Sequence, residues 1–100
     1  MSELDRTIHE PVRLRIMAIL SGVDLADFNF MLSALRLSKG NLACHVDKLE
    51  RAGYLEVRKS FNGKMPHTEY RLTDAGRTAL ADYWAALDAI RTNPHGGANS

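Results

Sequence analysis

Apolar residues in the first quarter of the chain recur at the spacing of an α-helix. Val12, Ile16 and Leu20 follow one another every four residues, so their side chains share one face. Gly22 comes directly after this pattern and is a residue type that commonly ends a helix. We therefore expect a first helix over residues 10–21.

Two more amphipathic helices are expected downstream, each preceded by a polar residue that can cap it. Asp27 stands before the second helix and Ser38 before the third, which ends at Gly53. The apolar positions of the second helix are Phe28, Met31, Leu32 and Leu35. Those of the third fall in one narrow sector, at Leu42, Val46 and Leu49. The rest of the third helix should face away from the core.

The next segment has the pattern of a β-hairpin. Apolar and polar residues alternate from Leu55 to Arg58, as expected for a strand with one buried face. Asn62-Gly63 is a dipeptide that is common in tight hairpin turns. Residues 68–72 then return as the second strand.

A final long helix is expected after the hairpin, capped by Thr73 or Asp74. The order helix, helix, helix, β-hairpin, helix predicts a winged helix-turn-helix. This fold is mainly α, with a three-helix core, a two-stranded wing and a long C-terminal helix. The chain of 100 residues has room for one such domain, which we expect over residues 1–91. Residues 92–100 include Pro, Gly, Asn and Ser and are expected to form a flexible tail.

Charge is divided unevenly between these elements. Residues 35–72, which hold the third helix and the hairpin, carry eight basic and four acidic side chains, a net charge of +4. The rest of the chain carries five basic and eight acidic side chains, a net charge of −3. A basic element on an otherwise acidic protein is typical of nucleic-acid binding, because neutralisation of phosphates dominates that affinity. The sequence therefore predicts a module that binds double-stranded DNA.

Three segments resemble small winged-helix transcriptional regulators of the MarR/ArsR type. They are residues 8–16 (IHEPVRLRI), 37–55 (LSKGNLACHVDKLERAGYL) and 68–77 (TEYRLTDAGR). The resemblance covers most of residues 5–91 and implies a repressor or activator that binds DNA as a homodimer through its terminal helices. Members often carry a small hydroxyl residue where this chain has Ala43, and a polar or basic residue where it has Cys44. The resemblance therefore carries over no target sequence.

The second and third helices of the chain form the expected helix-turn-helix. The second helix of such a motif enters the major groove, so the third helix of the chain, residues 38–52, is the expected recognition helix. Asn41 can bond adenine through its amide, whereas Lys48 suits a phosphate. The hairpin, residues 57–71, is expected to lie as a wing on the adjacent backbone or minor groove. An ordinary solvated helix face and protection of strand edges by lysine are the alternatives. The expected DNA contacts are Ser38, Lys39, Gly40, Asn41, Cys44, His45, Lys48, Arg58, Lys59, Asn62 and Lys64.

The final helix has a wider apolar stripe than packing within one small domain requires. Together with two apolar residues upstream of the first helix, it favours a two-fold interface between two copies. The expected interface residues are Leu4, Ile8, Leu80, Tyr83, Trp84, Leu87 and Ile90. Two-fold symmetry then requires an operator that is an inverted repeat. Packing of this helix on its own chain alone is the alternative.

The sequence gives little support to other kinds of chemistry. One cysteine, Cys44, excludes an intrachain disulfide and agrees with a reducing cytoplasm. One cysteine and four scattered histidines do not form a ligand set, so no metal and no cofactor is expected. The chain has no recognisable catalytic motif, so an enzyme is not expected. No apolar run approaches the roughly 20 residues that span a membrane.

The sequence thus predicts a cytoplasmic, homodimeric, sequence-specific regulator of transcription. One alternative is a winged-helix module that binds proteins instead of DNA. Another is a redox or ligand sensor that signals through Cys44 or through a pocket at the dimer interface, with an unidentified small-molecule effector. The operator, the regulated genes and the choice between repression and activation do not follow from the sequence.

Overall fold

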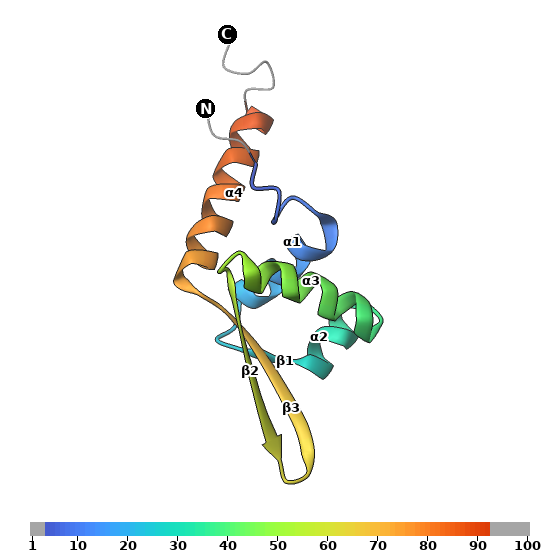
Figure 1. Cartoon of the computed structure of the whole chain (residues 1–100). Coiled ribbons are helices and arrows are strands. Elements are labelled where there is room, and N and C mark those ends of the chain that lie inside the picture. Colours follow the sequence, from blue (N-terminus) through green and yellow to red (C-terminus); the bar gives the residue numbers. More distant parts are fainter. Residues whose placement is uncertain (1–3, 93–100) are drawn as a thin grey trace.

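A computed structural model describes residues 4–92, so the expected flexible tail lies, beyond Thr92, outside the described residues. In chain order the elements are α1 (Pro11–Ser21), β1 (Ala26–Asp27), α2 (Phe28–Leu35), α3 (Lys39–Arg51), β2 (Leu55–Asn62), β3 (Met65–Leu72) and α4 (Asp74–Thr92). The first three helices form the body, and the β2–β3 wing projects from it on the side away from the end of α4 (Figure 1). This arrangement confirms the predicted winged helix-turn-helix. None of the helices within residues 4–92 is long and apolar enough to cross a membrane.

Side-chain caps fix where α2 and α3 begin. The carboxylate of Asp27 accepts a hydrogen bond from the N–H of Phe30 at 2.7 Å, and the hydroxyl of Ser38 accepts one from the N–H of Asn41 at 3.1 Å. Both expected caps are therefore confirmed. Between the two helices, Arg36 adopts a left-handed conformation with φ 56°. This conformation is unusual for a residue with a side chain, and it ends α2 as its C-cap.

The sheet has three strands in the order β1-β3-β2, one strand more than the sequence predicted. The additional strand, β1, pairs antiparallel with β3 and places Ala26 opposite Tyr70 and Asp27 opposite Glu69. A strand of two residues is too short to give a recognisable alternation, so the sequence pattern could not reveal it. Its effect is to attach the base of the wing to the start of α2.

The wing turn lies one residue further along the chain than expected. Asn62 pairs with Met65, so Gly63 and Lys64 are the central residues of the turn rather than Asn62 and Gly63. Gly63 has φ 65°, and it is the only central residue with a positive φ, as in a type II′ turn. Both wing strands are also longer than the sequence predicted. Their outer parts were missed because they are exposed and lack the alternation that marks a half-buried strand.

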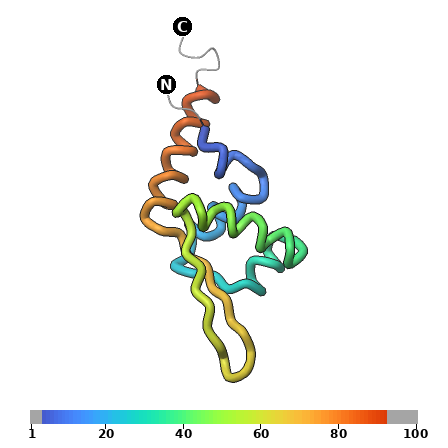
Figure 2. Tube along the Cα trace, viewed as in Figure 1, coloured from blue at the N-terminus to red at the C-terminus, as the bar shows by residue number. Residues whose placement is uncertain are grey.

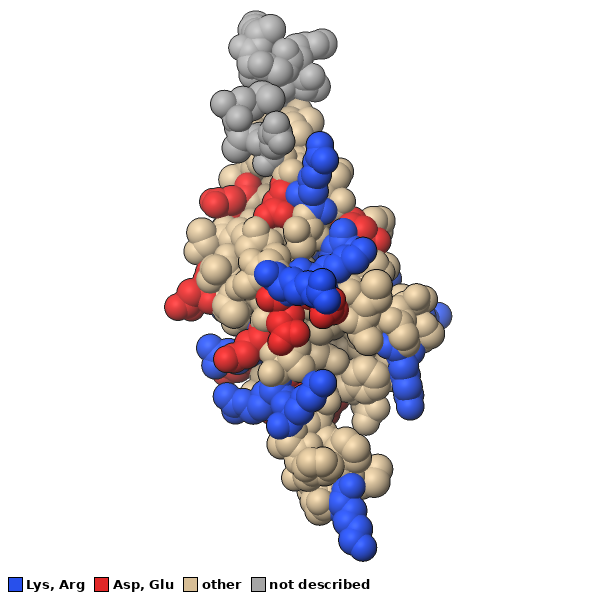
Figure 3. Space-filling model, viewed as in Figure 1, with Lys and Arg blue, Asp and Glu red and all other residues tan. Residues whose placement is uncertain are grey.

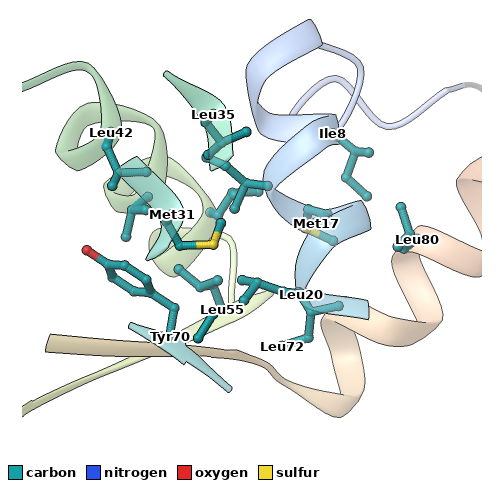
Figure 4. Packing of buried hydrophobic residues seen from close by; sticks show 14 of the residues in the cluster. Ile8, Met17, Leu20, Met31, Leu35, Leu42, Leu55, Tyr70, Leu72 and Leu80 are labelled. Carbon is teal, nitrogen blue, oxygen red and sulfur yellow. The ribbon is translucent and has the colours of Figure 1, made fainter. Parts of the chain in front are cut away.

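The hydrophobic core lies between α1, α2, α3, the inner end of the sheet and α4 (Figure 4). Its largest fully buried side chains are Ile8, Ile16, Met17, Leu20, Met31, Leu42 and Leu49. Full burial of one such side chain contributes about 1.5–3 kcal/mol. The buried side chains of α3 are the three predicted ones, Leu42, Val46 and Leu49. Their burial fixes the orientation of α3 about its own axis, so that its polar side faces outward.

The start of α4 is packed closely against the segment between α3 and β2. The hydroxyl of Thr73 accepts a hydrogen bond from the N–H of Gly76 at 2.9 Å, so Thr73 rather than Asp74 caps this helix. Gly76 is buried, and a Cβ placed on it would lie 2.1 Å from the carbonyl oxygen of Tyr54. The N–H of Thr73 donates to that same oxygen at 3.1 Å. Only a residue without a side chain allows α4 to approach so closely.

The segment before α1 packs against α4 and against the segment between α3 and β2. Ile8 is buried, and Nδ1 of His9 lies 2.8 Å from the hydroxyl of Tyr83 on α4. The hydroxyl of Tyr54 donates a hydrogen bond to Asp5. That hydrogen bond, with burial adding to it, raises the pKa of Tyr54 to about 12. The beginning of the described chain (blue) consequently lies beside the end of α4 (red), opposite the wing (Figure 2).

Candidate nucleic-acid interface

The outward side of α3 carries most of the candidate contacts that the sequence predicted for this helix. Ser38 caps the helix and leaves its first turn exposed, and the side opposite the three core residues is open to solvent. The predicted contacts found exposed here are Ser38, Lys39, Gly40, Asn41, Cys44 and Lys48. They offer hydroxyl, amide and ammonium groups, the types that contact bases and phosphates.

His45 lies at the edge of this side of α3, next to the core residues. Its ring is half-buried against α1, with Nδ1 3.3 Å from the guanidinium of Arg13 and 3.8 Å from the carboxylate of Glu10. Burial raises the pKa of Glu10, but the N–H of Arg13 and the charges of His45 and Arg13 lower it more, so its net pKa is lowered. His45 therefore joins α3 to α1.

A basic hollow of about 400 Å³ lies where the second half of α3 meets α1 and the segment before it. It is lined by Arg6, Thr7, Arg13, Lys48, Arg51 and Ala52. Nε of Arg13 donates to the carbonyl of Thr7 at 2.6 Å, which holds this guanidinium in place. Within residues 4–92, Arg6 and Lys48 form no ion pair. The sequence pattern indicated Lys48 but not Arg6 or Arg13, because only the tertiary fold brings them together.

A second hollow, of about 560 Å³, separates α3 from the inner face of the wing. Acidic residues of α3, Asp47 and Glu50, line it together with Lys59 of the wing. In the space-filling view, basic side chains lie over α3, at the base of the wing and at its end, and acidic side chains lie between α3 and the wing (Figure 3). An approaching phosphate would therefore meet favourable charge beside α3 and along the wing rather than between them.

The wing carries the remaining predicted contacts on its exposed surface. They are Arg58, Lys59, Asn62 and Lys64, the last two at or next to the turn. Arg71 is also basic, but its guanidinium forms an ion pair with Glu56 at 3.3 Å. Within residues 4–92, Arg58, Lys59 and Lys64 form no ion pair, so they carry the free positive charge of the wing.

Two apolar residues near the wing turn are unexpectedly exposed. Phe61 is 74% exposed and Met65 is 69% exposed. Pro66, also exposed, lies directly opposite Phe61 on the neighbouring strand. The sequence pattern did not indicate these residues. Lys59 interrupts the alternation of Leu55 and Val57 before it reaches Phe61, so the pattern of apolar positions gave no signal for Phe61.

The proposed dimer residues divide into two groups. Ile8, Leu80 and Tyr83 are buried in the core of the single chain, so they have almost no surface left for a partner. Leu4 and Leu87 are partly buried against the same core. Trp84 and Ile90 are 44% and 53% exposed on α4. The apolar surface open to a second copy is therefore carried mainly by Trp84 and Ile90.

Cys44 is a free thiol on the exposed side of α3. In the described part of the chain, no three His, Cys, Asp or Glu side chains gather into a group that could hold a metal ion. Neither observation adds a second type of site to the surface formed by α3 and the wing.

Comparison with known proteins identifies the family. A model of the winged helix DNA-binding domain matches residues 12–90, a span that includes the helix-turn-helix, the whole wing and most of α4. The chain belongs to the winged helix DNA-binding domain family. An uncharacterised protein of Methanocaldococcus jannaschii is 38% identical to this winged-helix chain over 72 residues, which are 72% of this chain and 78% of that protein.

Solved structures show the same winged-helix fold. The transcriptional regulator homologue of Pyrococcus horikoshii OT3 is 31% identical and has a TM-score of 0.82, with 88% of this chain and 87% of that chain covered. A protein described as a transcriptional regulator of the MarR family, from Enterococcus faecalis V583, is 25% identical and has a TM-score of 0.69, with 86% and 76% covered. The expected likeness of this winged-helix protein to MarR-type regulators is thereby confirmed.

Proposed function

We propose that this protein regulates transcription by binding double-stranded DNA as a homodimer, with α3 in the major groove and the wing on the adjacent backbone or minor groove. The observation that carries the proposal is the orientation of α3. Its apolar side is buried, and its capped polar first half is exposed beside the projecting wing. A helix in this position can present its side chains to base edges while the surrounding cations contact phosphates. The descriptions of the Pyrococcus and Enterococcus relatives support the same function.

A second copy of the chain belongs to this proposal. One recognition helix reads only a few base pairs, which is too little to select a site in a genome. The exposed apolar surface of Trp84 and Ile90 provides a contact for the partner. A two-fold dimer would bind an inverted repeat with half-sites about 10 base pairs apart, one turn of the duplex.

Selection from a random duplex library tests the proposal as a whole. The full chain is incubated with the library in the presence of non-specific competitor, and the bound fraction is amplified and sequenced over several rounds. We expect enrichment of one inverted repeat, which footprinting should show as protection of two half-sites. Equal retention of all sequences would contradict sequence-specific regulation.

Asn41 is the residue proposed to read a base. Asn41→Ala is expected to lose about 1–3 kcal/mol of discrimination at one base-pair position, the value of a bidentate amide contact. Its side chain is exposed and alanine favours helix, so the unfolding temperature should not fall. The measurement is the selection profile of the variant beside that of the wild type. Two identical profiles would show that α3 is rotated differently on its target.

Lys48 is proposed to contact a phosphate from the basic hollow. Lys48→Ala should weaken binding to all sequences alike and reduce the log–log salt slope by about 1, the contribution of one phosphate. Arg15→Ala is the matched control, because Arg15 is exposed on α1 but does not line the hollow. Titrations at several salt concentrations measure both slopes. Equal slopes for the two variants would remove the hollow from the interface.

A further inference from the structure

The end of the wing is apolar although solvent surrounds it. Among the described residues, Phe61 and Met65 are the most exposed large apolar side chains. Phe61 lies on the same face of the hairpin as Pro66, its direct cross-strand neighbour, and Met65 belongs to the opposite face. Apolar surface therefore occupies both faces of the hairpin next to the Gly63-Lys64 turn.

Protection of the sheet edge does not account for Phe61. β2 is an edge strand, since the strand order is β1-β3-β2. Charged residues or proline on an edge strand discourage pairing with another chain, whereas an exposed phenylalanine does the opposite. Nor does Phe61 support the core, because three quarters of its surface is exposed. An external partner would give the exposed aromatic side chain at this position a role.

The charge of the same segment indicates the chemistry of that partner. Residues 59–68 contain Lys59 and Lys64 and have no Asp or Glu. Lys64 is in the turn itself, and Lys59 is on the face of Phe61, two residues before it. A narrow hairpin that combines apolar side chains with cations only is complementary to a polyanion that also offers apolar surface. Duplex DNA meets this description, because stacked bases lie between its phosphates.

The outer part of the wing extends beyond the core by a length comparable to the distance between neighbouring grooves. Val57 and Tyr70 form the outermost cross-strand pair that packs on the core. Phe61 follows Val57 by four residues, which is about 13 Å along a strand. A major groove and the next minor groove are about 17 Å apart, half a turn of about 34 Å. Because the wing extends about 13 Å beyond the core, its end can reach the flanking minor groove when α3 lies in the major groove.

We propose that Phe61, flanked by Met65 and Pro66, is a wedge that enters the minor groove, partly unstacks one base step and bends the duplex. This inference rests on the proposed DNA-binding function and adds to it a specificity-determining residue. Phe, Met and Pro side chains inserted from the minor groove kink DNA by about 20–90°. Flexible pyrimidine–purine steps are the easiest to open, so the wedge selects sequence at a position that α3 does not contact.

The test compares the bend and the affinity of complexes on the selected duplex. Fluorescence energy transfer between dyes at the two ends measures the bend, and 2-aminopurine at the step beneath the wing reports unstacking. The wild type is expected to bend the duplex by at least about 20°. Phe61→Ala should abolish most of the bend and weaken binding about 10-fold, whereas Phe61→Leu should retain most of both. Replacing the step by a rigid A-tract should weaken the wild type but not Phe61→Ala.

Two further variants separate a wedge from a simple phosphate contact. Phe61→Lys adds a cation at the same position, so it should still lose the bend. A wing that only follows phosphates would instead gain affinity and a steeper salt slope from this change. Lys64→Ala should lower the affinity and the salt slope while the bend is retained. Melting followed by circular dichroism checks each fold, which these exposed positions should not disturb.

Each contrary result has a distinct meaning. A wild-type complex with an unbent duplex, or Phe61→Ala with an unchanged bend, would overturn the wedge while DNA binding stands. A change in the oligomeric state of Phe61→Ala, measured by light scattering, would overturn it by showing that the end of the wing contacts a second copy. Failure of the wild type to retain any duplex would overturn the proposed function, and the wedge with it.

Discussion

Replacing Trp84 and Ile90 together by alanine is expected to produce a folded monomer that binds an inverted repeat at least about 100-fold more weakly than the wild type. The loss follows from effective concentration. When two DNA-binding domains are joined, the second binds as an intramolecular event, which raises the affinity about 10²–10⁴-fold, and separating the domains removes that gain. Both side chains are about half exposed on α4, so their removal takes little from the core of one chain.

Light scattering and gel shifts provide the measurements for this pair of substitutions. Val23→Ala with Leu25→Ala is the matched control, because these apolar residues have comparable exposure but lie in the connection between α1 and β1. The control should remain dimeric and keep its affinity. A wild-type protein that is monomeric at micromolar concentration and protects one asymmetric half-site would contradict the dimer.

Alanine at Gly76 is expected to lower the free energy of unfolding by about 1–3 kcal/mol, the usual range for overpacking. The new Cβ would lie 2.1 Å from the carbonyl oxygen of Tyr54, and that oxygen belongs to the backbone and cannot rotate away. α4 must then move outward, which also strains the hydrogen bond from Thr73 to the same oxygen. For a domain of this size, thermal unfolding should shift downward by about 4–8 °C per kcal/mol.

Gly40 provides the opposite result for the same chemical change. It lies in α3, and a Cβ there would meet no other atom within 4 Å. Gly40→Ala should therefore raise the free energy of unfolding by about 0.5–1 kcal/mol, because alanine loses less conformational entropy in a helix. Melting curves of the two variants decide the matter. If both shift in the same direction by similar amounts, the close approach of α4 to Tyr54 is not what positions this helix.

The features that sequence could predict are those decided by neighbouring residues. Asp27 and Ser38 cap α2 and α3 through hydrogen bonds that span three residues, so the local pattern was sufficient to place them. The buried stripe of α3 was predictable for the same reason, since helical periodicity depends only on spacing. The two-residue strand β1 was not, because its existence depends on pairing with residues more than forty positions away.

The parts of the candidate site that sequence could not provide depend on tertiary structure. Arg6 and Arg13 join Lys48 in one hollow only because α1 crosses the second half of α3. His45 was predicted as a DNA contact, but its contact with Arg13 directs it to α1. The periodicity of α4 also predicted a wide apolar stripe. It did not show that Tyr83 is buried in the core of its own chain whereas Trp84 remains exposed. Each distinction requires knowing which element lies opposite a given side chain.

Asp27 has two structural roles at once, and together they determine how the molecule transmits force. It is the last residue of β1, paired with Glu69 of the wing, and its carboxylate caps the first turn of α2. No loop separates the sheet from the helix-turn-helix at this point. The wing and α2 are therefore joined directly, with Asp27 as the shared residue. In the proposed mode of binding, a displacement of the wing would shift the start of α2 and, through the packing of α2 on α3, the position of α3 on its target.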